Sequence, residues 1–116
     1  MTITESGANT ITVTDVLVRD VWMCGGQSNM AYNLGGSPDA ATYTGIRWMW
    51  VNTGAPFVLA DPWRNITSTW NECLASNIGN FSAVAYYFAR TIYLDQSSNI
   101  PIGLIGNSVW KSLTFG

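Results

Sequence analysis

The chain has 116 residues, of which 47% are hydrophobic and 10% are charged, and its formal net charge is −2. This composition is too apolar for a disordered chain and has too few charges for a solvated helical bundle. The basic residues are scattered, so no basic patch forms and a nucleic acid is not expected as a partner. No apolar run approaches the roughly 18 residues that a membrane helix needs, so no membrane partner is expected either.

The absence of histidine is the most restrictive feature of the composition. It removes the commonest general base, so a Ser-His-Asp triad cannot be complete within this chain. It also removes the commonest zinc ligand, and we expect neither a metal nor another cofactor. Two cysteines, Cys24 and Cys73, are too few for a disulfide framework, which leaves one bridge or two buried free thiols.

Two strands are expected first along the chain. Residues 9–19 (NTITVTDVLVR) alternate and are rich in β-branched side chains, which predicts a strand or a hairpin arm. Residues 20–24 (DVWMC) are more uniformly apolar and predict a second strand that stops at the pair Gly25-Gly26. Residues 31–45 are rich in Gly, Ser, Asp and Asn, which is typical of a loop with room for one helical turn.

Two further strands flank the best predicted helix. Residues 46–51 (IRWMWV) and residues 100–105 (IPIGLI) are short, nearly continuous apolar runs, which are typical of strands covered on both faces. Residues 52–80 show little periodicity and predict a long loop that carries Trp63 and Trp70.

Residues 82–96 predict a helix. Ser82 is a suitable N-cap, and Phe81 and Tyr86 have the spacing of a hydrophobic staple. An apolar stripe runs along one face of this predicted helix, and a second set of apolar positions flanks it. The stripe is Val84, Phe88 and Ile92, and the flanking positions are Ala85, Ala89 and Tyr93.

Buried strands separated by a helix predict an α/β fold with a parallel sheet. Ligands of such sheets bind outside the carboxyl ends of the strands. Ser28 follows one such end, and Asn107, Ser108 and Trp110 follow another. We therefore expect the Ser28 hydroxyl to project from the end of a central parallel strand into an open cleft.

Ser28 has two interpretations on physical grounds. The glycines before it allow a sharp turn that brings backbone N–H groups close to a reacting carbonyl, as a serine nucleophile requires. The hydrolase motif G-x-S-x-G is only half present, because Met30 replaces the second glycine. Serine is also common in turns without any chemistry, so a plain loop residue is the alternative.

The run DVWMCGGQSNM at residues 20–30 resembles the nucleophile block of the sialate O-acetylesterase family, whose members are SGNH-type hydrolases with a flavodoxin-like, three-layer parallel α/β sheet. Residues 46–47, 81–90 and 100–105 are similar to later segments of the same family. The similarity covers about residues 9–110, whereas residues 111–116 diverge. The resemblance identifies residues 1–116 as a partial, truncated SGNH hydrolase domain, namely an N-terminal portion of the family's catalytic domain.

The resemblance implies that Ser28 attacks an acetyl ester on a carbohydrate and that its own backbone N–H donates to the oxyanion. Gln27, Asn29 and Trp110 are the substrate-binding candidates, although hydrogen-bonding of the turn is an alternative role for the two amides. Lys111 follows Trp110 where the family has a glycine.

No counterpart of the family's Asp/His pair is present, so the chain is expected to be impaired. Two alternatives stay open: a non-catalytic fragment that binds a carbohydrate or a protein partner, and a complementary chain that supplies His and Asp. Family members are often secreted or lysosomal, but no signal peptide is recognisable, so the compartment stays unassigned.

Other side chains also have two interpretations. Trp48 and Trp50 fall in a predicted buried strand, which favours core packing over sugar stacking. Trp63 and Trp70 fall in a loop, where both roles stay open. Arg47 could hold a ligand carboxylate, but capping or snorkelling at the start of its strand is the favoured role.

Overall fold

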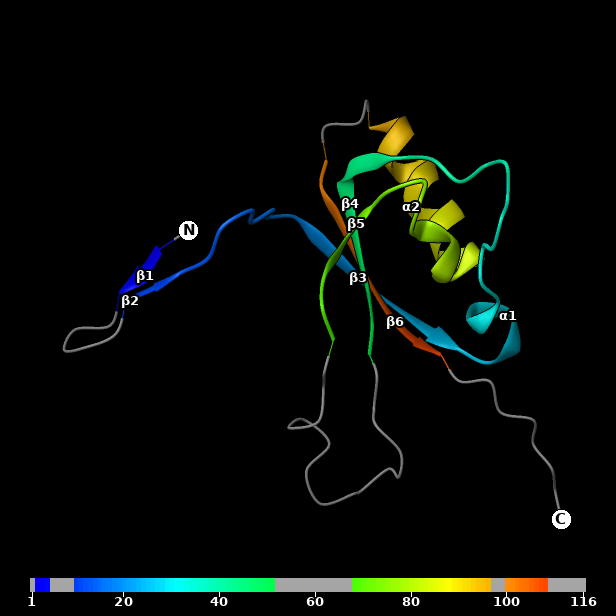
Figure 1. Cartoon of the computed structure of the whole chain (residues 1–116), viewed down its shortest axis with the longest axis horizontal. Helices are drawn as coiled ribbons and strands as arrows, with labels where there is room; N and C mark the ends of the chain where they lie inside the picture. Colours follow the sequence, from blue (N-terminus) through cyan, green and yellow to red (C-terminus); the bar gives the residue numbers. More distant parts are fainter. Residues whose placement is uncertain (1, 5–9, 52–67, 97–99, 109–116) are drawn as a thin grey trace, which may run out of the picture.

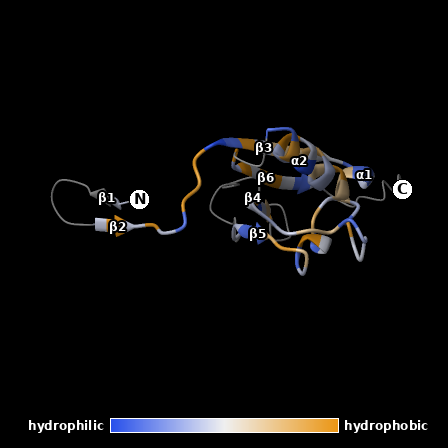
Figure 2. Ribbon diagram, turned by 90° about the horizontal axis from the view of Figure 1, so that it is seen from above, coloured by the Kyte–Doolittle hydropathy of each residue, from blue (hydrophilic) through white to orange (hydrophobic). Residues whose placement is uncertain are grey.

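The computed structural model describes residues 2–4, 10–51, 68–96 and 100–108. A small antiparallel pair, β1 (Thr2–Thr4) and β2 (Thr10–Thr12), forms an arm that extends away from the main body (Figures 1 and 2). The long strand expected over residues 9–19 is therefore wrong beyond Thr12. Asp15 has a φ of 54°, in the left-handed region, and this interrupts the extended backbone that the alternating pattern predicted.

The main body is built on a four-stranded sheet in the order β3-β6-β4-β5. Its strands are β3 (Asp20–Gly26), β4 (Tyr43–Trp50), β5 (Asn71–Cys73) and β6 (Ile102–Ser108). β6 is parallel to both β3 and β4, whereas β5 is antiparallel to β4. The α/β class and the parallel strands are confirmed, and β5 appears within the range expected to be a loop.

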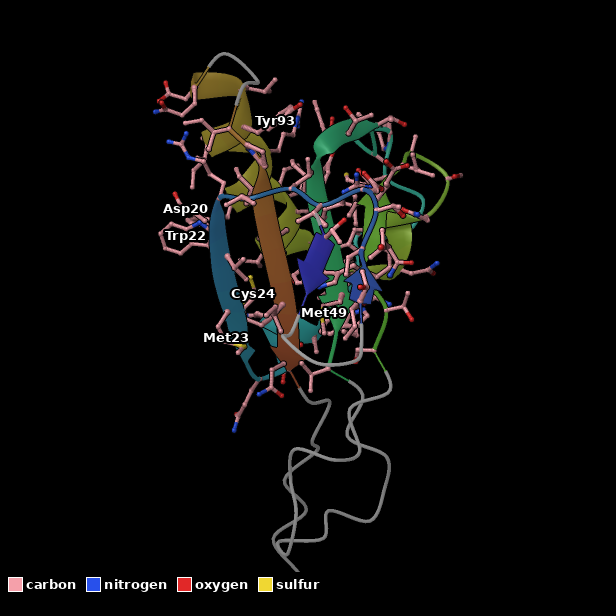
Figure 3. All side chains as sticks on the ribbon, turned by 90° about the vertical axis from the view of Figure 1, so that its left-hand side faces the viewer. Asp20, Trp22, Met23, Cys24, Met49 and Tyr93 are labelled. Carbon is pink, nitrogen blue, oxygen red and sulfur yellow. The ribbon has the colours of Figure 1, made fainter. Side chains whose placement is uncertain are left out.

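β3 differs from its prediction in two ways. It continues through Gly25 and Gly26, because β6 pairs with both glycines as well. It is also an edge strand of the four-stranded sheet and not a central one, at least among the residues that the structure describes. Figure 3 shows this edge, with Trp22 projecting beyond it.

The helices pack on one face of the sheet (Figure 1). They are α1 (Ser28–Ala31), the 3-10 turn η1 (Ile78–Asn80) and α2 (Ala83–Asp95). The N-cap is confirmed, since the Ser82 hydroxyl accepts a hydrogen bond from the Ala85 N–H at 3.3 Å. The core lies between α2 and the sheet, and its largest fully buried side chains include Tyr86, Phe81, Ile46, Ile78, Ile102 and Leu104.

Of the apolar stripe of α2, only Ile92 packs partly against the core. The flanking positions Ala85, Ala89 and Tyr93 are buried together with Tyr86, whereas Val84 and Phe88 are exposed. The cause is tertiary: small residues allow the helix to approach the sheet closely, and the large apolar side chains of the neighbouring stripe are left outside.

Tyr86 also fixes the connection between β3 and β4. Its buried hydroxyl donates to the Asp39 carbonyl at 2.7 Å and accepts from the Ala41 N–H at 3.2 Å. Two hydrogen bonds with a residue of α2 thus hold the predicted loop at residues 31–45 in place. The last residues of that predicted loop, from Tyr43 onward, belong to β4.

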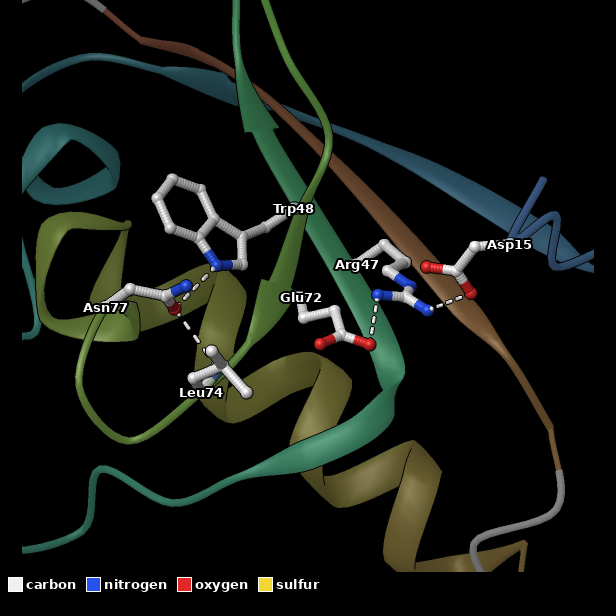
Figure 4. Close-up of polar contacts among 6 residues, drawn as sticks. All are labelled: Asp15, Arg47, Trp48, Glu72, Leu74 and Asn77. Atoms are coloured by element: carbon white, nitrogen blue, oxygen red, sulfur yellow. Dashed lines mark hydrogen bonds and ion pairs between the residues drawn. The ribbon is translucent and has the colours of Figure 1, made fainter. Parts of the chain in front are cut away.

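The other face of the sheet carries no helix in the described part of the chain. The irregular segment at residues 13–19 crosses it, held by the Arg47 guanidinium, which forms ion pairs with Asp15 at 2.9 Å and with Glu72 at 2.7 Å (Figure 4). Figure 4 also shows how Asn77 orders the chain between β5 and η1, because its side-chain oxygen accepts from the Trp48 Nε1 and from the Leu74 N–H.

Candidate active site

The turn after β3 places Ser28 at the first position of α1. Gly26 makes this turn possible through a close approach: a Cβ at this position would lie 2.7 Å from the Cγ and 3.2 Å from the Cβ of Met30. Real Cβ atoms essentially never show a contact of 2.7 Å, so any larger residue would displace Met30 or the turn. The glycine therefore lets α1 fold back directly against the end of the strand.

The backbone of the turn leaves donors available. The Met30 N–H donates to the Gln27 carbonyl at 2.8 Å, which closes the turn. The N–H groups of Ser28 and Asn29 have no hydrogen-bond partner within the described ranges. Ser28 itself is exposed. An exposed hydroxyl beside unpaired backbone donors is the minimum that an acyl-transfer site requires.

The neighbouring strand ends level with this turn. In the parallel register Gly25 pairs with Asn107 and Gly26 pairs with Ser108, so these two polar residues belong to the end of β6 and do not follow it. Asn107 is exposed, whereas the Ser108 hydroxyl oxygen is buried and lacks a hydrogen-bond partner in the part of the chain that is described. Sequence reasoning placed both near a strand end, but only the register brings them beside the Ser28 turn.

The predicted binding residues have different outcomes. Gln27 and Asn29 flank Ser28 and are exposed, so the structure brings these three side chains to one end of the sheet. Trp110 lies outside the described residues, as do Trp63 and the divergent tail.

The usual proton acceptor of a serine hydrolase, a histidine, has no counterpart in this chain. The sequence has no histidine, and the described residues contain no cluster of three His, Cys, Asp or Glu side chains that could hold a metal ion. Cys24, four residues before Ser28 in β3, does not substitute. It is a buried free thiol, and burial raises its pKa, so it stays protonated and unreactive at neutral pH.

The second cysteine is also free and buried, so no disulfide joins the pair. Burial raises the pKa of the Cys73 thiol as well, and a hydrogen bond from the Tyr43 backbone opposes this shift. Both cysteines therefore serve as small core side chains.

The tryptophans of β4 belong to the core. Trp48 is buried, with its ring centroid 5.1 Å from that of Phe81. Trp50 lies 4.9 Å from the same ring, and its Nε1 donates to the Asn80 carbonyl at 2.8 Å. Core packing is thus confirmed for this pair of tryptophans. Trp70, in contrast, is 46% exposed.

A cavity of about 440 Å³ lies far from Ser28, at the amino ends of the parallel strands. The crossing segment at residues 13–17 forms one wall, and Arg47, Trp70 and Gly103 contribute to the other. The Arg47 guanidinium forms ion pairs with the carboxylates of Asp15 and Glu72. Neither expected role, binding a ligand carboxylate or capping and snorkelling at the start of the strand, includes these ion pairs. Since strand-end chemistry requires the opposite end of the sheet, we place the candidate active site at Ser28 and not in this cavity.

Comparisons with known proteins assign the family. No family model matches the chain, but it is 34% identical to the sialate O-acetylesterase of Mus musculus over 89% of its length and 37% identical to that of Rattus norvegicus over 89%. A crystal structure of a carbohydrate acetylesterase from Xanthomonas citri matches 85% of the chain with a TM-score of 0.69 and 32% identity. By its sequence and fold, the chain belongs to the sialate O-acetylesterase family.

The chain spans 22% of the length of the two rodent sialate O-acetylesterases and 23% of the Xanthomonas citri protein. All three of these relatives are esterases by name. No helix of the described residues has the length and apolar character needed to cross a membrane.

Proposed function

We propose that this chain carries the nucleophile of a carbohydrate esterase that removes O-acetyl groups from sugars. The observation that carries the proposal is the exposed Ser28 at the carboxyl end of a parallel strand, with unpaired N–H groups beside it. The names of its relatives, sialate O-acetylesterase and carbohydrate acetylesterase, support an acetylated sugar as the substrate.

In this reaction the Ser28 Oγ forms a bond to the acetyl carbon while the proton of the hydroxyl passes to a base. The C–O bond to the sugar then breaks, the sugar oxygen takes up a proton, and water later releases acetate from the serine. The Ser28 N–H donates to the oxyanion, and the Gln27 and Asn29 side chains hold the sugar or the turn. Trp110 is the remaining substrate-binding candidate from the sequence.

The base must come from outside this chain, because no histidine is present. Loss of a triad member typically lowers the rate by about 10⁴- to 10⁶-fold. A complementary polypeptide that supplies His and Asp would restore it. The same absence favours a second function, a non-catalytic fragment with a carbohydrate-binding or partner-binding role.

An aryl acetate distinguishes these functions. We expect a slow release of phenolate from the purified chain, up to one equivalent per protein, that disappears in Ser28→Ala; this single release is called the burst. Ser76→Ala, which changes an exposed serine of another turn, is the matched control and should keep the burst. A burst that survives in Ser28→Ala would remove the nucleophile from the proposal, and binding of an acetylated sugar without any burst would favour the non-catalytic function.

A further inference from the structure

The cavity at the amino ends of the parallel strands has a floor made by one row of the sheet. Val21 of β3 and Arg47 of β4 both pair with Gly103 of β6, so the three residues lie side by side on one face, and all three line the cavity. Ile102 and Leu104, on the other face, are buried in the core. The row therefore belongs to the face without a helix in the described part of the chain, and its glycine leaves the middle of the floor without a side chain.

Trp70 adds an aromatic surface to this cavity. The residue lies immediately before β5, and its ring atoms Cη2 and Cζ3 are 3.3 Å and 3.6 Å from the position that a Cβ of Gly103 would occupy. The indole thus reaches across the sheet to the glycine, yet 46% of the residue is exposed, in contrast to the buried Trp48 of the core. Part of the indole surface is consequently free to contact a ligand.

The crossing segment at residues 13–17 forms the opposite wall of the cavity. The ion pair between Asp15 and Arg47 fastens this segment to the sheet (Figure 4). Since the Asp15 side chain is 67% exposed, this attachment is weak. The wall is therefore able to adjust to a ligand without disturbing the sheet below it.

The charges around the cavity are balanced. Two lining residues are basic, Arg19 and Arg47, and two are acidic, Asp15 and Asp20. The side chains of Arg19 and Asp20 are exposed, and neither has an ion pair or a hydrogen bond within the described ranges. One free donor group and one free acceptor group beside an exposed indole favour a neutral ligand that has hydroxyls at its edge and an apolar face.

We propose that this cavity binds a neutral pyranose sugar, with the CH face of the sugar ring on Trp70 and the sugar hydroxyls directed to Arg19 and Asp20. A volume of about 440 Å³ lies within the range of small-molecule sites. The site is separate from the chemistry at Ser28, because the seven residues of β3 hold the two about 20 Å apart. A single sugar ring in the cavity is thus not the one whose ester Ser28 would attack.

The test is a titration of the purified chain with methyl β-D-glucopyranoside, followed by the NMR signals of the tryptophan indole N–H groups. We expect the Trp70 signal to shift with a dissociation constant of about millimolar size, as is usual for so small a ligand. The Trp22 signal is the internal control and should not move, since this tryptophan is similarly exposed at 44% but packs against Phe88 outside the cavity. Amide hydrogen exchange in residues 13–17 should become slower when the sugar is bound.

Trp70→Ala should weaken sugar binding by at least about 10-fold, measured by saturation transfer to the ring hydrogens of the sugar, because the stacking surface is lost. Trp22→Ala should bind as the native chain does, and thermal melts of both variants establish that they are folded. Absence of a Trp70 shift, an equal shift of Trp22, or binding that Trp70→Ala leaves unchanged would each overturn the proposal. So would binding of adenosine, a planar aromatic ligand, in preference to the sugar. Ser28→Ala should keep the Trp70 shift, so that the failure of this site and the failure of the proposed esterase are distinguished.

Discussion

Gly26 and Met30 are in direct contact across the turn that presents Ser28, and there is no room between them for a Cβ at position 26. The strand, the turn and the first helical residues are thereby held as one unit. The position of the candidate nucleophile therefore depends on this contact as well as on the hydrogen bond from the Met30 N–H to the Gln27 carbonyl.

Gly26→Ala should displace Met30 and with it the Ser28 hydroxyl. We expect the phenolate release, or labelling of Ser28 by a fluorophosphonate, to fall by at least about 10-fold, since misplacement of a nucleophile by 1 Å can cost far more than that. Gly36→Ala is the matched control, because a Cβ there meets nothing within 4 Å. Equal labelling of the two variants would show that the turn tolerates a larger residue.

Asp15→Asn should loosen the crossing segment with little effect on the whole fold. Asp15 is 67% exposed, and exposed ion pairs contribute under about 1 kcal/mol to the free energy of unfolding. Hydrogen exchange in residues 13–19 should become faster, while the melting temperature changes little. Asp95→Asn, at the exposed end of α2, should leave exchange in that segment unchanged. A large loss of global stability in Asp15→Asn would mean that the segment is part of the core.

The free energy of unfolding should decrease at alkaline pH. Burial raises the pKa of Cys24, Cys73 and Tyr86 in the folded state. Unfolding exposes these groups, which then lose protons more readily, so the stability they contribute is complete below the ordinary thiol pKa of about 8.5 and is lost as the pH rises through the folded values. Denaturant titrations between pH 7 and pH 10 measure this slope.

The double variant Cys24→Ala/Cys73→Ala is the control for the alkaline effect. It should start from a lower stability, because two core side chains become smaller, but its slope above about pH 8.5 should be shallower. A native chain whose stability is flat across this range would contradict the assignment of buried thiols.

Ser82→Ala should destabilise α2 at its N-terminus. The substitution removes the acceptor for the Ala85 N–H and leaves a buried donor unpaired, which typically costs about 1 kcal/mol. Thermal melting should drop by a few degrees, whereas Ser76→Ala, at an exposed turn, should not change it. A Ser82→Ala melt equal to that of the native chain would show that the cap contributes nothing.

Local signals predicted several elements correctly. The apolar run at β3, the cap at Ser82 and the glycine-rich turn are each visible within a few residues, and each appears in the structure. β5 was missed because three residues, Asn71–Cys73, are too short to show any alternation. The strand or hairpin arm predicted over residues 9–19 is present only at Thr10–Thr12, where β2 pairs with the three residues of β1, and is wrong beyond them.

The remaining errors concern long-range arrangement. Two neighbouring faces of α2 are comparably apolar, and only packing decides that Ala85 and Ala89 face the sheet while Val84 and Phe88 do not. Strand order has no local signature either, so the edge position of β3 could not be foreseen. For the candidate site, the exposure of Ser28 was predicted, whereas the pairing of Ser108 with Gly26 follows from a register that no single stretch encodes.

The register of β3 against β6 fixes the position of Ser28 relative to the end of β6. Each residue of a strand advances the chain by about 3.3 Å and turns the next side chain to the other face. One residue inserted into or deleted from β3 would therefore raise or lower Ser28 by that distance relative to the end of β6 and exchange the two faces of the strand. Length changes in a lineage that keeps the chemistry should consequently accumulate in the connections between strands and spare the seven positions from Asp20 to Gly26.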